Sequence, residues 1–178
     1  MKNKDSGIRS KLSYDIIESM PNGPIKKYFN KHWSKTHTLA NLINNYEKNG
    51  YNFDKEAGML FRPRKIAQEE LNRTCLDIVF LRPSTAHYHP DVIEMVTPLS
   101  GQGKLYTFSE NPTDSDDYYI SDVNLLISDK PRSRAIDINQ IHAFKPDPYL
   151  EINLVCSGIL DMDKEVTIKS FDKWSKYV

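Results

Sequence analysis

The feature that most constrains the fold is a series of short apolar runs, spaced roughly ten residues apart, that begins near Cys75. Pro, Gly, Asp and Asn separate the runs, and this punctuation is typical of β-strands joined by turns. Strands at this spacing favour an antiparallel sandwich or barrel over a βαβ sheet. The predicted strands are 75–81, 85–89, 93–98, 104–108, 118–120, 123–127, 135–138, 141–144, 150–157 and 165–169.

The residues before this series follow a helical period instead. Apolar side chains at 8–20 recur at threes and fours, which predicts a helix that ends before a Pro-Asn-Gly-Pro breaker. Pro24 suits the first turn of a second short helix, and a third is expected between residues 34 and 50. We therefore expect a helical N-terminal segment, 1–73, that packs on a β-barrel domain, 74–178.

The charge balance does not favour a nucleic-acid partner. Lys+Arg and Asp+Glu both total 24, so the formal net charge is +0. Residues 1–81 carry 14 basic against 9 acidic residues (+5), and residues 82–178 carry 10 against 15 (−5). The predicted helix 36–51 has few basic or amide groups placed to read a major groove. A DNA-binding regulator with an N-terminal helix-turn-helix is therefore kept as a less favoured alternative.

The sequence also bears on where the protein resides. The two cysteines, Cys75 and Cys156, do not form a disulfide framework or a zinc knuckle by themselves, which favours a reducing compartment. The charged N-terminus has no apolar core of a secretion signal, and no run approaches the ~18 apolar residues of a spanning helix. We expect a cytoplasmic protein with no membrane partner.

One segment concentrates metal-binding side chains. His87 and His89 lie two positions apart, so on a strand both imidazoles project from the same face. Pro90-Asp91 offers a turn, after which a returning strand brings the Glu94 carboxylate toward the same point. Two imidazoles and a carboxylate suit a divalent transition metal with positions left open for water, O2 or substrate.

The spacing His-x-His-x4-Glu-x6-Gly, which His87, His89, Glu94 and Gly101 satisfy, resembles the first signature motif of the cupin superfamily. The resemblance covers roughly residues 75–170. It implies a mainly β fold, a small jelly-roll barrel with a metal ion inside.

The resemblance also implies a fourth ligand, because a second cupin motif supplies another histidine from a later strand. His142 is the one histidine that follows Glu94, and we carry it over to that role. The family usually has a Pro-x-Gly turn before this histidine. Here Asn139 stands where glycine is customary, and asparagine tolerates a left-handed backbone. The implied metal ligands are His87, His89, Glu94 and His142.

Further candidates come from the strands around this segment. Arg82 is a candidate rim residue that binds an anionic group of the substrate. Tyr106 shares a strand face with Lys104 and Phe108. We predict catalytic roles for Glu94, Arg82 and Tyr106.

The implied function is that of a mononuclear metal-dependent enzyme. A centre with three histidines and one carboxylate leaves two neighbouring positions open on an octahedral ion. The resemblance favours Fe(II), with Mn, Ni or Zn as alternatives, and a non-haem iron oxygenase or dioxygenase that acts on a small polar or anionic metabolite. A cupin isomerase, decarboxylase or lyase is the alternative enzyme, and a ligand-binding cupin without catalysis also stays open. A homodimer is expected from the resemblance.

Overall fold

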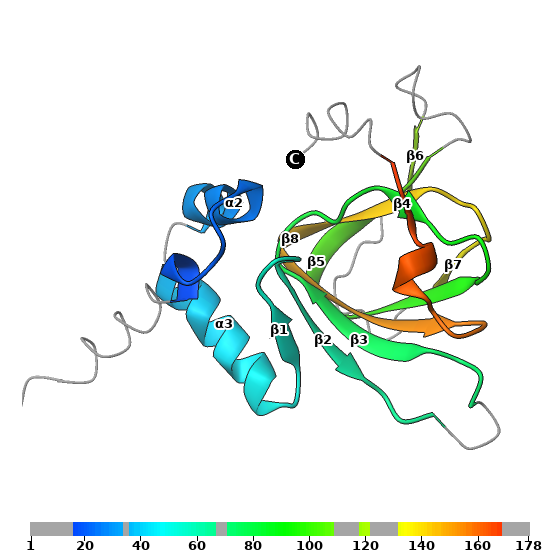
Figure 1. Ribbon diagram of the computed structural model, residues 1–178, viewed down its shortest axis with the longest axis horizontal. Helices are drawn as coiled ribbons and strands as arrows, with labels where there is room; N and C mark the ends of the chain where they lie inside the picture. Colours follow the sequence, from blue (N-terminus) through cyan, green and yellow to red (C-terminus); the bar gives the residue numbers. More distant parts are fainter. Residues whose placement is uncertain (1–15, 34–35, 67–70, 109–117, 122–131, 169–178) are drawn as a thin grey trace, which may run out of the picture. The chain divides into compact units, whose positions relative to one another are not determined.

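The computed structural model describes residues 16–33, 36–66, 71–108, 118–121 and 132–168. The chain divides into two compact units, of which the first ends at Arg62 and the second begins at Pro63 (Figure 1). This division lies earlier in the chain than the predicted boundary between residues 73 and 74. That boundary stays a prediction, as does the packing of the N-terminal segment on the barrel.

The first unit contains the expected helices. Pro24 opens α2 (Pro24–His32), and α3 (Thr36–Lys48) is followed by Gly50, whose φ of 84° closes the helix in the left-handed region. Of the predicted helix 8–20, residues 16–18 are helical and most of the rest lies outside the described residues. Among the residues that the structure describes, no helix is long and apolar enough to cross a membrane.

A β-hairpin, which the sequence reading missed, follows the helices. Strand β1 (Asn52–Asp54) pairs antiparallel with β2 (Met59–Pro63). The Asp54 carboxylate closes the turn by accepting the backbone N–H groups of Glu56 and Ala57, each at 2.9 Å. The two strands are short, and neither shows the alternation that marked the later strands.

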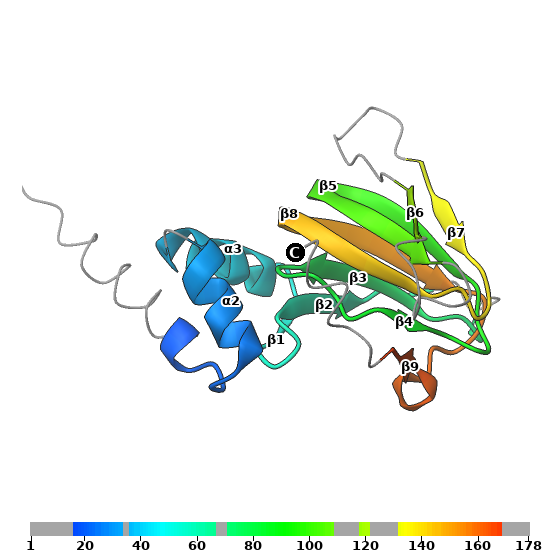
Figure 2. The same cartoon turned by 90° about the horizontal axis from the view of Figure 1, so that it is seen from above.

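The strands of the second unit form one curled antiparallel sheet, which Figure 2 shows from above. The central strand is β8, which pairs with β5 on one side and with β3 and β4 on the other. Strand β5 also pairs with β6 and β7, and β4 pairs with β9. The elements are β3 (Cys75–Phe80), β4 (His87–Tyr88), β5 (Glu94–Phe108), β6 (Tyr118–Ser121), β7 (Arg134–Ile136), β8 (His142–Cys156), the 3-10 turn η2 (Met162–Lys164) and β9 (Val166–Thr167).

Two long strands replace four of the predicted ones. The expected strands 93–98 and 104–108 are the two ends of β5, and 141–144 and 150–157 are the two ends of β8. The residues between them that read as turns are accommodated by irregular pairing, with register shifts between Pro98 and Ser100 and between Gly101 and Gly103. The expected strand 123–127 lies outside the described residues.

The two faces of the sheet differ in character. From Leu150 to Cys156 the even-numbered residues of β8 are buried, whereas the odd-numbered ones, such as Glu151 and Asn153, are half-buried, and the even-numbered His142 at the start of the strand is buried as well. The register Glu94↔Cys156 places the Glu94 side chain on the same face as these even-numbered residues. One face of the curled sheet therefore carries the motif residues together with buried apolar side chains such as Leu150 and Ile152.

Candidate metal centre

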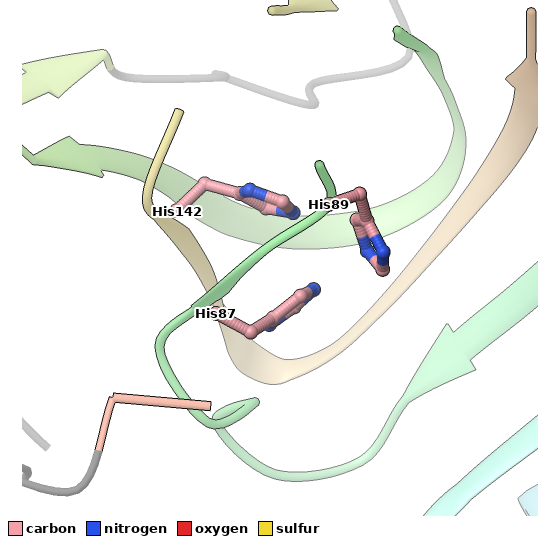
Figure 3. Close-up of side chains that lie close together, drawn as sticks. All are labelled: His87, His89 and His142. Atoms are coloured by element: carbon pink, nitrogen blue, oxygen red, sulfur yellow. The ribbon is translucent and has the colours of Figure 1, made fainter. Parts of the chain in front are cut away.

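Three histidines from two strands converge on this inner face. His87 lies in β4 directly opposite His142 at the start of β8, and His89 follows β4 by one residue. One ring nitrogen from each of them lies within 4.8 Å of the other two. Figure 3 shows the three rings turned toward a common point. The alternation predicted for His87 and His89 is thus present, and the sheet adds the distant His142.

Glu94 completes the cluster from the first residue of β5. Its carboxylate is 3% exposed, with Oε2 at 3.0 Å from His142 Nε2 and Oε1 at 3.4 Å from His89 Nε2. The four residues predicted as metal ligands are therefore brought together.

Backbone carbonyls fix the tautomers of two of the rings. His87 Nδ1 lies 2.7 Å from the Thr85 carbonyl oxygen, and His142 Nδ1 lies 3.0 Å from that of Gln140. A carbonyl oxygen only accepts hydrogen bonds, so each Nδ1 carries the proton and donates it. In the neutral ring, Nε2 then keeps a lone pair, which is the form that binds metal ions.

Burial and the neighbouring charges shift the pKa values of the side chains in the cluster. Burial lowers the pKa of His87 to about 3, with the charge of His142 acting in the same direction. It also lowers the pKa of His89, against the opposing effect of Glu94. Burial alone would raise the pKa of Glu94, but the proximity of His142, His89 and His87 outweighs it and holds this pKa below its ordinary value. At neutral pH the site therefore holds neutral His87 and His89 beside an ionised Glu94.

The contact between Glu94 and His142 fits a bound cation. Glu94 Oε2 and His142 Nε2 are both buried, lie 3.0 Å apart and have no other hydrogen-bond partner among the residues that the structure describes. Two ligand atoms that bind one ion at about 2.1 Å and at right angles lie about 3.0 Å apart. A proton or a metal ion would join these two atoms, but only a metal ion would also use the lone pairs of the other rings.

The turn before His142 adopts the conformation that the asparagine allows. Asn139 has a φ of 63°, in the left-handed region where a glycine is customary in the motif. Its backbone N–H donates to the His89 carbonyl at 3.0 Å. The turn therefore links the two histidine segments.

The other two predicted catalytic residues, Arg82 and Tyr106, do not share the surroundings of Glu94. Tyr106 pairs with Ala143, so it lies on the face opposite His142 and packs with Ala86 and Ile141. Arg82 follows β3 and donates from its guanidinium to the Pro83 carbonyl at 3.0 Å. Their catalytic roles stay predictions, and the placement of Tyr106 does not support one at the triad.

Sequence reasoning gave no role to a second carboxylate near this site. Glu165 directly precedes β9, which pairs with β4. Burial raises the pKa of Glu165, and the charge of Glu94 acts in the same direction while His142 opposes it. Only its place at the start of a predicted strand, 165–169, was visible in the sequence, because pairing with the histidine strand is a tertiary property.

Several solved structures share this fold. A protein from Shewanella oneidensis matches at 12% identity with a TM-score of 0.53, covering 70% of this chain and 82% of its own. The capsular polysaccharide assembling protein CapF from Staphylococcus aureus matches 66% of this chain at 14% identity and a TM-score of 0.52, and the chain spans 32% of its length. A cupin-2 domain from Rhodospirillum rubrum matches at 14% identity and a TM-score of 0.47, over 70% of this chain and 76% of its own.

Oxalate decarboxylases and a nucleoside dehydratase match at TM-scores of only 0.47–0.49. No family model matches the chain, and no curated protein matches its sequence. The mainly β fold that the strand pattern and the motif predicted is confirmed, and so are the small N-terminal helices that the helical period predicted. This chain therefore has a mainly β fold built on a curled antiparallel sheet, and the inner face of that sheet carries a histidine triad positioned for a metal ion.

Proposed function

We propose that this chain is a mononuclear metal-dependent enzyme of the oxygenase type that acts on a small polar or anionic metabolite. The observation that carries the proposal is the convergence of His87, His89 and His142 on the buried Glu94 carboxylate. These four residues would hold the ion. Fe(II) is the favoured ion because the motif resembles that of a family with many iron dioxygenases, and Mn, Ni or Zn are the alternatives that suit the same ligands.

The ion, when bound, supplies Lewis acidity, and iron(II) additionally supplies redox chemistry with O2. The chain supplies the fixed directions of the ligands, since the carbonyls of Thr85 and Gln140 orient two of the imidazoles. It also supplies an apolar wall. Phe144 packs edge-on against the His142 ring at 5.8 Å and stacks on Phe80 at 4.8 Å, which keeps water from that side of the ligands.

Metal analysis of the anaerobically purified full chain tests the site. We expect about one iron per chain in the wild type and loss of at least nine tenths of it in His87→Ala, since each direct ligand is needed. The matched control is His32→Ala, which removes an exposed histidine stacked on Tyr28 in α2. Full metal content in His87→Ala would overturn the assignment of the ligands.

Oxygen consumption tests the reaction type. The iron-loaded protein is mixed with a panel of small hydroxy and keto acids while dissolved O2 and product formation are followed together. Oxygenase chemistry predicts that product formation stops when O2 is removed. Turnover that continues without O2 would replace this proposal with an isomerase, decarboxylase or lyase that uses the same four ligands.

A further inference from the structure

Glu165 presents a second carboxylate on the side of the sheet that holds the triad. In the pairing of β4 with β9, Thr167 lies opposite His87 and Val166 lies opposite Tyr88. Glu165 has an extended backbone and lies two residues before Thr167, so its side chain projects from the same face as His87 and His89. Ile168, on the alternate face, packs with the cluster that contains Tyr88, which agrees with this alternation.

The backbone of Glu165 is held in place by its surroundings. Asp161 caps η2 by accepting the Asp163 N–H, and the Glu165 N–H donates to the Met162 carbonyl at 3.2 Å. Lys164 binds the Asp91 carboxylate at 2.8 Å and so ties η2 to the segment between His89 and Glu94. The Glu165 side chain thus starts from a fixed position beside the histidine segment.

The Glu165 carboxylate itself is half-buried. Within the part of the chain that the structure describes, it makes no hydrogen bond and no ion pair. It is close enough to His142 and Glu94 for their charges to act on it. A partly desolvated carboxylate without a donor gains free energy from any ligand that brings one.

We propose that Glu165 determines substrate specificity at the metal site by accepting a hydrogen bond from a hydroxyl or amino group of the bound substrate. This inference rests on the proposed function. It narrows the substrate class to small molecules that carry such a donor beside their metal-binding oxygen, such as 2-hydroxy acids.

The charge balance supports this class. Glu94 and an ionised Glu165 would together carry two negative charges, which equal the charge of a divalent ion. The ion therefore leaves no net positive charge to attract a simple anion, and an added donor group is what distinguishes a good ligand from a poor one.

Matched small ligands test the proposal on the full chain loaded with Co(II), whose absorption spectrum reports ligand binding. Acetate and glycolate share a carboxylate, and glycolate adds one hydroxyl. We expect Glu165→Ala to lower the ratio of glycolate to acetate affinity about fivefold, the value of one hydrogen bond. Glu165→Gln keeps an acceptor but not the charge, so it should keep most of the ratio while binding acetate about threefold tighter.

The control is Asp163→Asn, which removes an exposed carboxylate from the same turn and should change neither affinity. An unchanged ratio in Glu165→Ala overturns the inference while leaving the metal site in place. A loss of Co(II) affinity in both Glu165 variants would instead make Glu165 a metal ligand and also overturn it. If the wild type binds no Co(II), the proposed function itself fails.

Discussion

At the scale of single residues, metal binding at the site depends on which ring nitrogen of each histidine carries a proton. The Thr85 and Gln140 carbonyls hold a proton on Nδ1 of His87 and His142, which leaves the Nε2 lone pairs for an ion. Opposite His142 lies the Glu94 carboxylate, which offers lone pairs rather than a hydrogen. A neutral His142 ring would leave two electron-rich atoms facing each other in a buried place, which would make the metal-free site less stable than its packing suggests.

Glu94→Gln is expected to have opposite effects on the metal-free protein and on metal binding. The new amide can donate a hydrogen bond to His142 Nε2, so the metal-free protein should gain about 1 kcal/mol in free energy of unfolding. The loss of the charged ligand should weaken Co(II) binding at least tenfold, an order of magnitude typical of site residues. Urea unfolding after chelation and a Co(II) titration measure the two effects.

The matched control for this variant is Glu56→Gln, which changes an exposed carboxylate in the β1–β2 turn. It should leave both quantities within experimental error. A fall in the stability of the metal-free Glu94→Gln protein would show that the carboxylate and His142 already share a proton.

At the scale of elements, the two long strands set the register that assembles the site. Strand β5 pairs with β8 from Glu94↔Cys156 to Thr107↔His142, so one ligand lies near each end of this pairing. Irregular pairing around Gly101 lets the strands stay together across the segment that the sequence marks as a turn. The glycine of the motif therefore serves the sheet rather than the metal.

Gly101→Ala is expected to lower the free energy of unfolding by at least about 2 kcal/mol. The residue has a φ of 79°, and an added Cβ would lie 2.3 Å from the Tyr149 carbonyl oxygen on β8, so the backbone must move. Gly23→Ala is the control, because a Cβ there meets no atom within 4 Å. Urea unfolding compares the two, and equal stabilities would contradict this role for Gly101.

At the scale of the whole molecule, the ligands come from segments that are distant in the sequence. His87 and His89 lie with β4, Glu94 begins β5 and His142 begins β8, so an ion would join three strands of the second unit. A ligand that binds the folded chain alone stabilises it by mass action. The predicted homodimer and cytoplasmic location stay predictions.

Metal removal should therefore lower the thermal stability of the chain. At a free Co(II) concentration one hundred times the Kd, the gain is about 2.7 kcal/mol, which for a chain of this size raises Tm by roughly 5–10 °C. Thermal unfolding with and without a chelator measures the shift. The rise in Tm should be absent in His142→Ala and complete in His32→Ala. A full rise in Tm in His142→Ala would place the ion elsewhere.

Much of this arrangement was readable from local pattern. The alternation of His87 and His89, the turn before Glu94 and the tolerance of Asn139 for a left-handed backbone all depend on residues within a few positions of one another. The sequence did not predict that β5 and β8 are each one continuous strand. It also did not predict the hairpin β1–β2. Bulged pairing and short edge strands leave little periodicity, so the sequence shows turns where the structure has pairing.

The sequence by itself determined the strand-rich second unit, the helical start and the candidate ligands His87, His89 and Glu94, because periodicity and spacing are local properties. His142 was added by the resemblance to the second cupin motif. Only the tertiary structure decided which of the other polar side chains share the inner face. The register of β8 against β5 placed Tyr106 on the face opposite His142, and the pairing of β9 with β4 placed Glu165 on the same face as His87. Which face a side chain occupies depends on pairing between distant strands, and a shift of one residue would have reversed it.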